Sequence, residues 1–394
     1  MKEVPISDLV DEKISGEWGV EPSNGLSIKV LRTTNFTNEG KLKLDSVVER
    51  EIDRKIVDRK RLKYGDTIIE KSGGSPNQPV GRVVLFDLDT DEPFLCNNFT
   101  AILRPTKDVN PRYFFWSLFS KHLNKSTLRY QNKTTGILNL KLERYLEEEK
   151  IKLPDLKTQQ KIAGILEQAD AARQKRKQSN QLTEQFLQSA FLEMFGDFRL
   201  MIPRYEIKKL GEIAERVTDG EHTTPIRQAS GIKLLSARNI KNGYFDFEAG
   251  VDYIGEDEYN RMNKRVKPQL NDVLLSCSGT IGRVLTVKIN EPFQLVRSVA
   301  LIRINQDVLH PVYLEYLLRS DYGQFEIDKR ANKSSQANIF TNPIKDIPIV
   351  IPPLPLQQKF AALVEQVERL RAKQRESERE LDNLFQSLMQ KYFG

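Results

Sequence analysis

Three histidines and two cysteines are the side chains of this sequence best suited to metal binding or nucleophilic chemistry. They are His122, His222 and His310, with Cys96 in one half of the chain and Cys277 in the other. Metal sites and nucleophilic pairs that can be recognised in a sequence place such residues at short, fixed spacings. The wide spacing therefore predicts buried, unpaired cysteines in a reducing compartment and histidines with structural roles.

Motifs for phosphate binding and methyl transfer are missing from the sequence. No G-x-x-x-x-G-K-[ST] loop is present, which excludes an ATPase of that class. No glycine-rich loop follows a strand in the dinucleotide or methyl-donor style. The nearest approach to an Asn-Pro-Pro-aromatic element is Asn342-Pro343-Ile344, which reads as a turn before a strand at 347–351. The sequence therefore predicts a chain without catalytic machinery.

The composition is that of a globular protein with a basic surface. Of 394 residues, 39% are hydrophobic and 29% are charged, and the net charge is +7. This length allows two to three domains at roughly 150 residues each. A basic excess suits a phosphate backbone, although many basic proteins bind no nucleic acid. With no signal peptide and no apolar run long enough to span a bilayer, we expect a cytoplasmic protein with no membrane partner.

The chain contains an internal repeat with an offset of 198 residues. KLPDLKTQQKIAGILEQ from Lys152 aligns with VIPPLPLQQKFAALVEQ from Val350, and the register continues without a gap to Gly394. Upstream the halves match more loosely, for example at 81–83 against 282–284. A repeat with similar ends and diverged globular parts predicts a common framework that carries two different specificities.

Each globular part has the pattern of a small α+β domain. Gly, Asn, Asp and Pro separate short β-like runs, which predicts strands joined by turns. The expected strands lie at 67–69, 81–86 and 101–103, and at 272–276, 282–287 and 300–304. A helix follows in each part, at Pro111–Leu123 and at Pro311–Leu318, because proline fits the first helical position.

The repeated segments predict two long helices with apolar residues at alternating steps of three and four, interrupted by polar ones. The second seam consists of Phe360, Leu363, Val367, Leu370, Gln374, Ser377, Leu381, Leu384 and Leu388. The first consists of Ile162, Ile165, Ala169, Ala172, Arg176, Ser179, Thr183, Phe186 and Ala190. Each helix could dock on its own domain. We favour an antiparallel pair, which would relate the halves by a pseudo-twofold axis, because neither seam could be buried alone.

Several segments resemble the specificity subunits of type I restriction–modification systems. Leu153-Pro154 and Ile351-Pro352-Pro353-Leu354, each followed by Gln-Gln and a long charged helix, resemble the conserved regions of that family. Residues 218–225 (TDGEHTTP) are similar to its Thr-Asp-Gly-x-His element, and 232–239 (IKLLSARN) to the strand that follows. Ser278-Gly279-Thr280-Ile281-Gly282 is also typical of the family. The resemblance spans the whole chain, although 15–19 (SGEWG) in the first half is a looser match.

The resemblance implies an α+β fold with two target-recognition domains joined by two long antiparallel coiled-coil helices. The domains would be residues 1–150 and 198–349, with a central conserved helix at 151–197 and a C-terminal one at 350–394. Each domain would read one half of a split, asymmetric double-stranded DNA target, and the helices would set the spacing.

The same resemblance implies partners that carry the chemistry. Two modification subunits would dock on the helices and methylate adenine N6, and restriction/translocase subunits would cleave. S-adenosylmethionine, ATP and Mg would belong to those subunits, so we expect no cofactor in this chain and no catalysis by it alone.

Base reading needs hydrogen-bond donors and acceptors at loop tips, such as Arg for guanine and Asn or Gln for adenine. In the first domain the candidates are Arg32, Thr33, Asn35, Lys71, Ser72, Tyr130, Gln131, Asn132 and Lys133. In the second they are Thr223, Arg227, Arg238, Asn239, Ser278, Thr280, Lys329, Arg330, Asn332 and Lys333. The alternative for each is a turn residue that satisfies local backbone groups.

Two other functions fit the same sequence. One is a stand-alone DNA-binding protein of the same fold without a methylating partner. The other is a structural coiled-coil adaptor whose globular domains bind protein.

Overall fold

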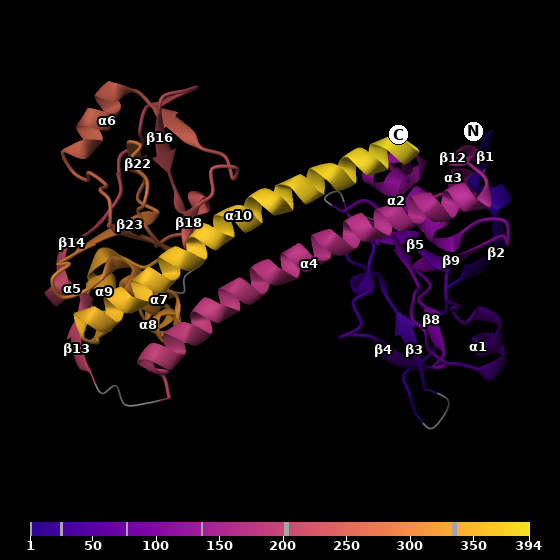
Figure 1. Ribbon diagram of the computed structural model, residues 1–394, viewed down its shortest axis with the longest axis horizontal. Coiled ribbons are helices and arrows are strands. Elements are labelled where there is room, and N and C mark those ends of the chain that lie inside the picture. Colours follow the sequence, from indigo (N-terminus) through magenta and orange to yellow (C-terminus); the bar gives the residue numbers. More distant parts are fainter. Residues whose placement is uncertain (1, 24–26, 76–77, 135–136, 201–204, 333–336) are drawn as a thin grey trace. The chain divides into compact units, whose positions relative to one another are not determined.

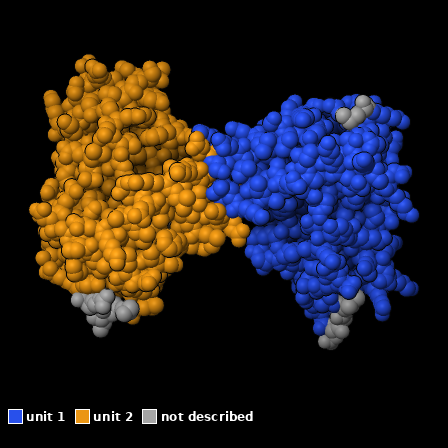
Figure 2. Space-filling view, in the orientation of Figure 1, with its two compact units in different colours: residues 1–176, 377–394 blue, residues 177–376 orange. Residues whose placement is uncertain are grey.

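Strands and helices are distributed over two compact units in the computed structural model, which describes residues 2–23, 27–75, 78–134, 137–200, 205–332 and 337–394 (Figure 1). The first unit comprises residues 1–176 and 377–394, and the second comprises 177–376 (Figure 2). Each unit therefore contains one globular part and a portion of each long helix, α4 (Leu156–Phe195) and α10 (Leu354–Phe393).

Over its described residues, the first unit contains short strands and three further α-helices. Its strands are β1 (Lys2–Pro5), β2 (Val10–Ser15), β3 (Ser27–Leu31), β4 (Val48–Glu51), β5 (Thr67–Glu70), β6 (Ser72–Gly74), β7 (Val83–Leu85), β8 (Phe94–Cys96), β9 (Thr100–Pro105), β10 (Gln131–Thr134), β11 (Ile137–Leu140) and β12 (Lys150–Leu153). Its helices are α1 (Arg54–Lys60), α2 (Pro111–Leu123) and α3 (Leu142–Glu148).

The second unit repeats this plan with additional short elements. Its strands are β13 (Glu206–Lys209), β14 (Ala214–Asp219), β15 (Arg227–Gln228), β16 (Ile232–Leu235), β17 (Ile240–Lys241), β18 (Tyr244–Phe245), β19 (Asp252–Ile254), β20 (Val273–Ser276), β21 (Val284–Thr286), β22 (Phe293–Leu295), β23 (Val299–Ile304) and β24 (Pro348–Ile351). Its helices are α5 (Leu210–Ile213), α6 (Glu256–Asn263), α7 (Pro311–Arg319), α8 (Asp321–Arg330) and α9 (Thr341–Lys345).

The sheets of the two units have the same topology. An antiparallel sheet of order β2-β9-β5-β7 in the first unit corresponds to β14-β23-β20-β21 in the second. A mixed sheet of order β4-β3-β8 corresponds to β19-β16-β22, and the second unit adds β15 beside β19. The pair β3–β8 and its counterpart β16–β22 are parallel. The pairs β1–β12 and β13–β24 also correspond. The strands predicted from the sequence are therefore confirmed, and the repeat is a repeat of fold.

Helices α2 and α7 begin where their prolines predicted. Pro111 and Pro311 each occupy the first turn, and α2 ends at the expected Leu123. The repeated Gln-Gln explains how these helices meet the long ones. The side-chain oxygen of Gln159 accepts from the Asn110 N–H at 2.8 Å, and that of Gln357 accepts from the His310 N–H at 2.8 Å. Both glutamines are buried, so the motif locks each long helix to the helix cap beside it.

Helices α4 and α10 pair antiparallel, as predicted. In the first unit the Arg173 guanidinium pairs with Asp382 at 2.6 Å. In the second, the Gln374 amide donates to the Ser179 hydroxyl at 3.1 Å, and the Phe360 ring lies 5.4 Å from that of Phe191. Residue numbers rise along α4 as they fall along α10, which defines the antiparallel direction.

The predicted seams are wrong at several positions. Phe186, Leu370 and Leu384 are about half exposed, at 51%, 51% and 50%. The buried stripes instead include Val364, Phe385 and Met389 of α10, and Leu187, Phe191 and Phe195 of α4. The difference arises because each helix packs against a globular core as well as against the other helix, so the buried face is wider than a coiled-coil seam and is rotated from it.

Candidate nucleic-acid interface

The histidines and cysteines occupy structural positions. Burial raises the pKa of the Cys96 thiol to about 11 and that of Cys277 to about 12, so both thiols are neutral at neutral pH. Burial, helped by the charge of Arg82, lowers the pKa of His122 to about 4. His310 caps α7 by accepting the Val312 N–H.

His222 is the one histidine with an acidic partner in the described part of the chain. Its Nε2 lies 2.6 Å from one Asp219 oxygen, and Arg265 lies 2.9 Å from the other. Within the described ranges, no group of three or more His, Cys, Asp or Glu could hold a metal, and no helix is long and apolar enough to cross a membrane.

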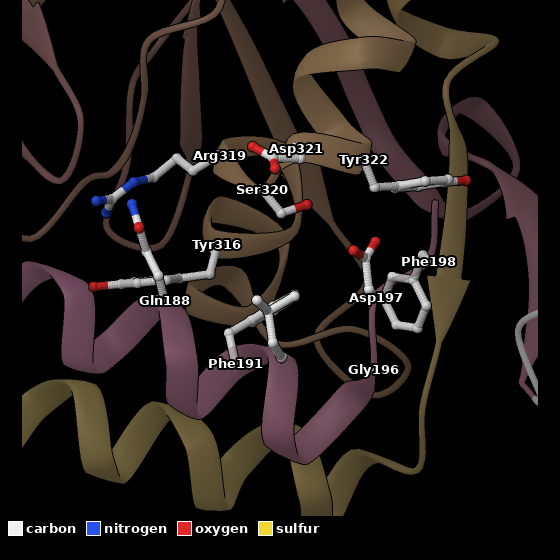
Figure 3. Close-up of a pocket in the computed structure, with 11 residues that line it drawn as sticks. Gln188, Phe191, Gly196, Asp197, Phe198, Tyr316, Arg319, Ser320, Asp321 and Tyr322 are labelled. Atoms are coloured by element: carbon white, nitrogen blue, oxygen red, sulfur yellow. The ribbon is translucent and has the colours of Figure 1, made fainter. Parts of the chain in front are cut away.

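A pocket between the end of α4 and the α7–α8 junction contains no reactive pair (Figure 3). The residues that line it include neither histidine nor cysteine. Arg319 is its one cation, and its guanidinium is held by Glu315 at 2.9 Å and stacked over Tyr316. The pocket therefore offers packing and carboxylates, such as Asp197 and Asp321. The hydroxyl of Ser320, which also lines it, donates to the Leu317 carbonyl at 2.7 Å instead of to a side-chain base.

Four segments of the second unit meet where strands β14, β16, β20 and β22 end. They are residues 219–221, 235–239, 276–280 and 296–299. The Val296 N–H donates to the Leu235 carbonyl at 3.0 Å, and the Cys277 N–H to that of Ser298 at 2.9 Å. We call this set of segments the strand-end edge of the second unit. Loops fixed by strands on both sides are suited to hold reading side chains in defined positions.

The first unit has the same edge, made of residues 15–17, 31–35, 70–73 and 97–100. The Asn97 N–H donates to Leu31 at 2.9 Å, and the Lys71 N–H to Phe99 at 2.9 Å. These bonds match those of the second unit one for one. The strand-end edge is therefore a duplicated backbone frame.

A glycine is required at the same point of each edge. A Cβ on Gly16 would lie 1.9 Å from the Asn97 carbonyl oxygen, and one on Gly220 would lie 2.3 Å from that of Leu295. Both distances are far inside van der Waals contact, so the backbones could not approach with any other residue. The looser first-half segment 15–19 therefore occupies the same place as 218–225.

Three predicted contact residues are instead part of the interior. Asn35 and Asn239 are 0% exposed. The side-chain oxygen of Asn35 accepts a hydrogen bond from the Arg32 backbone N–H at 2.8 Å. Tyr130 is a core residue whose hydroxyl donates to Glu149 at 3.1 Å. Direct base contact by these three is therefore wrong in this structure, because their polar groups are satisfied internally.

The other predicted residues lie at or near the surface. Those that are exposed are Asn132, Thr223, Arg227, Arg238, Thr280, Lys329 and Asn332. Those that are half-buried are Arg32, Thr33, Lys71, Ser72, Gln131, Ser278 and Arg330. The side chain of Lys133 and the whole of Lys333 lie outside the described residues. DNA contact by the surface residues stays a prediction.

The fold brings the distant parts of each predicted set together. In the first unit, the small sheet β10-β11-β6 places Ser72 and Asn132 on strands either side of β11. In the second, Ser278 and Asn332 each bridge to Asn338. The guanidinium of Arg330 pairs with Glu326 of its own helix, α8.

The turns after β8 and β22 were missed by sequence reasoning. They place exposed Arg297 on the second edge and Phe99, which is 41% exposed, on the first. Each turn directly precedes a predicted strand, at 101–103 or 300–304. That adjacency is the signal that could have identified them.

The loop after Gly220 is held by an ionised carboxylate. Glu221 is 8% exposed, and it accepts from both the N–H and the hydroxyl of Thr223, at 2.9 and 2.8 Å. Burial alone would raise the pKa of Glu221, but the Thr223 hydrogen bonds and the charges of Arg261 and Arg265 lower it. Thr223 is therefore a positioned residue whose own donors are already engaged.

Comparisons with known proteins show the family of the chain. The chain matches the family described as the type I restriction modification DNA specificity domain twice, over residues 3–184 and 204–381. It is 22% identical to the type I restriction enzyme EcoBI specificity subunit of Escherichia coli, over 98% of this chain and 89% of that protein. It is 24% identical to the MjaVIII specificity subunit of Methanocaldococcus jannaschii, over 75% of this chain and 72% of that one.

Solved structures share the fold. The type I restriction–modification S subunit from M. genitalium aligns with a TM-score of 0.59 at 14% identity, covering 100% of this chain and 96% of that chain. A chain from a structural study of type I system assembly aligns with a TM-score of 0.55 at 17% identity, covering 100% and 97%. Since the family match extends over both halves of the chain, this protein belongs to the type I restriction–modification DNA specificity family, the specificity subunits that its sequence resembles.

Proposed function

We propose that each unit reads one half of a bipartite, asymmetric double-stranded DNA target through its strand-end edge. The observation that carries this proposal is one backbone frame with two sets of side chains. Where the first edge has Lys71 and Phe99, the second has Cys277 and Ser298 at the same hydrogen-bonded positions. A base sequence is read by side-chain donors and acceptors, so unlike half-sites need unlike side chains on a common frame.

Helices α4 and α10 would hold the two readers apart and bind the modification subunits. Successive major-groove faces of B-DNA lie about 34 Å apart, so the readers need a fixed separation that a paired helix gives better than a flexible linker. Exposed apolar residues on these helices, including Phe186, Leu370 and Leu384, are suited to contact a partner.

Catalysis would reside in those partners. Two modification subunits would methylate adenine N6 with S-adenosylmethionine, and restriction/translocase subunits would use ATP and Mg. This chain would supply the specificity of the complex.

Methylation mapping tests the proposal. A host that expresses the chain with its modification subunits should acquire N6-methyladenine in one split motif. Exchanging residues 1–150 for another recognition domain should change one half of that motif, and exchanging 198–349 should change the other. Lengthening the first helix by a turn should alter only the spacer. A change in both halves after one exchange would contradict the assignment.

Co-purification separates this function from its alternatives. A specificity subunit should copurify with an adenine methyltransferase, whereas a stand-alone DNA-binding protein or a coiled-coil adaptor should not.

A further inference from the structure

Two arginines share one carboxylate beside the strand-end edge of the second unit. The Nε–H of Arg227, on β15, donates to one Asp252 oxygen at 3.1 Å. A terminal nitrogen of Arg238, which follows β16, lies 3.1 Å from the other oxygen. The side chains of Arg227 and Arg238 are 47% and 48% exposed, so this arginine pair can be reached by a ligand.

Cations outnumber carboxylates in this group, which leaves donors unused. Arg261 in the same unit is the contrast, because Glu258 and Glu221 both pair with it. A guanidinium carries five N–H donors. Among the described residues, neither terminal nitrogen of Arg227 donates a hydrogen bond. Asp252 thus holds Arg227 by its inner nitrogen and leaves the outer fork available.

A free terminal fork is the group that recognises guanine. Two parallel N–H donors match the O6 and N7 acceptors that guanine presents in the major groove. Anchoring through Nε restricts the side chain before the ligand arrives, so less conformational entropy is lost on binding. Arg238 supplies a second cation beside the first, where phosphate or a neighbouring base acceptor would lie.

The first unit lacks this group at the same register. Asp252 stands opposite Leu234, the last residue but one of β16, and Val48 stands opposite Val30, the last but one of β3. A valine cannot bind a guanidinium. At this register the arginine pair therefore belongs to the second unit and has no counterpart among the described residues of the first.

We propose that Asp252 is a positioning residue that presents Arg227, with Arg238 beside it, to a guanine in the half-site read by the second unit. The inference rests on the proposed function and adds the class of base that one edge reads. Asp252 itself touches no base, and its effect on specificity passes through Arg227.

Selection from a random duplex library with the full chain in complex with its modification subunits tests the proposal. The wild-type complex should enrich a bipartite motif with a G·C pair in the second half. Arg227→Lys keeps the charge but loses the fork, and should reduce preference for that guanine by roughly tenfold or more. Asp252→Asn should reduce it severalfold and leave the first half unchanged.

Glu291→Gln is the matched control. Glu291 pairs with Lys233 at the start of β16, away from the strand-end edge. Glu291→Gln replaces a carboxylate by an amide, so it changes the charge of the unit by the same amount as Asp252→Asn. It should leave the guanine preference intact. Equal loss of specificity in both variants would overturn positioning in favour of a general charge effect.

The two proposals fail in different ways. If the wild type enriches a bipartite motif and Arg227→Lys and Asp252→Asn enrich the same one, the guanine assignment is wrong and the proposed function stands. If the wild type enriches no bipartite motif, the proposed function fails and the guanine assignment fails with it.

Discussion

The two strand-end edges have the same backbone arrangement, but different side-chain contacts stabilise their loops. In the first unit, Arg82 is 8% exposed and binds both oxygens of Glu70 at 2.9 Å. Its guanidinium also donates to the carbonyl of Thr33 in the loop above, at 3.1 Å. In the second unit, the equivalent contact is a single bond from the Arg283 N–H to the Ser276 hydroxyl at 2.9 Å.

This difference shows where divergence is tolerated in a duplicated fold. Strand pairing and the close glycine approach are backbone properties, so both units keep them. Side chains that fill the same positions are free to change when their neighbours change with them. The first unit accordingly places the buried ion pair of Arg82 and Glu70 under its loop, while the second has a neutral hydrogen bond at the same position. The second unit adds a group of charges nearer the surface, where Arg227 and Arg238 meet Asp252.

The largest expected effects test whether each unit depends on its own stretch of α10. Phe385 packs 5.6 Å from Trp116 in the first core, and Phe360 packs 5.4 Å from Phe191 in the second. Phe385→Ala should lower the unfolding free energy of the first unit by about 3–5 kcal/mol, although Phe385 is far in sequence from the rest of that unit. Phe360→Ala should do the same to the second.

Hydrogen exchange resolved by unit is the measurement. Faster exchange in α2 but not in α7 is expected for Phe385→Ala, and the reverse for Phe360→Ala. If either variant loosened both units equally, the cores would not be independent and the division into two units would be wrong.

The supports beneath the edges should differ in strength. Glu70→Gln leaves the buried Arg82 without a counter-charge and should destabilise the first unit by about 3–4 kcal/mol. Ser276→Ala removes one neutral hydrogen bond and should cost the second unit about 1 kcal/mol. Urea unfolding followed by exchange in each unit would check both values. Similar losses would show that the two edges are supported alike.

Local signals in the sequence predicted the scaffold well. Pro111 and Pro311 located the starts of α2 and α7, alternating apolar runs located the central strands, and the ungapped repeat predicted the antiparallel helix pair. The proline and strand signals depend on residues close together in the chain. The repeat relates distant residues, but aligning the chain with itself reveals it, so a single sequence contains all three signals.

Burial set by distant segments was not predictable in the same way. Leu370 and Leu384 continue a heptad pattern yet are exposed, because globular cores determine which helix face is covered. Asn35 and Asn239 look like adenine readers, yet the loops fold back onto their amides. The type of a polar residue alone does not show whether its side chain bonds to the backbone of its own turn or faces outward to bind a ligand.

Acid should destabilise the first unit through His122. Its folded pKa of about 4 lies below its ordinary value of 6.5, so the unfolded chain binds a proton at higher pH than the folded unit. The contribution is fully present above pH 6.5, and about 2–3 kcal/mol should be lost as pH falls from 6.5 to 4. The pKa of His310 in the second unit is also lowered by burial.

His122→Gln distinguishes the units. The variant should flatten the pH dependence of the first unit's unfolding free energy in this range and leave that of the second unit, with its intact His310, as in the wild type. An unchanged pH profile in the first unit would show that His122 is not the titrating group.

The smallest stability effects, and the sharpest functional ones, are expected at exposed residues on the edges or on the strands beside them. Thr280 and Asn132 are exposed, so replacing either by Ala should change the unfolding free energy by no more than about 0.5 kcal/mol. Thr280→Ala should alter base preference in the half-site of the second unit only, and Asn132→Ala in that of the first only. Thermal unfolding and library selection measure the two effects separately.

The atoms that stabilise these loops differ from the atoms that would contact bases. A variant that loses specificity without losing stability therefore supports the edge as the reading surface. If both variants bound DNA with wild-type preference, the reading surface would lie elsewhere on these domains.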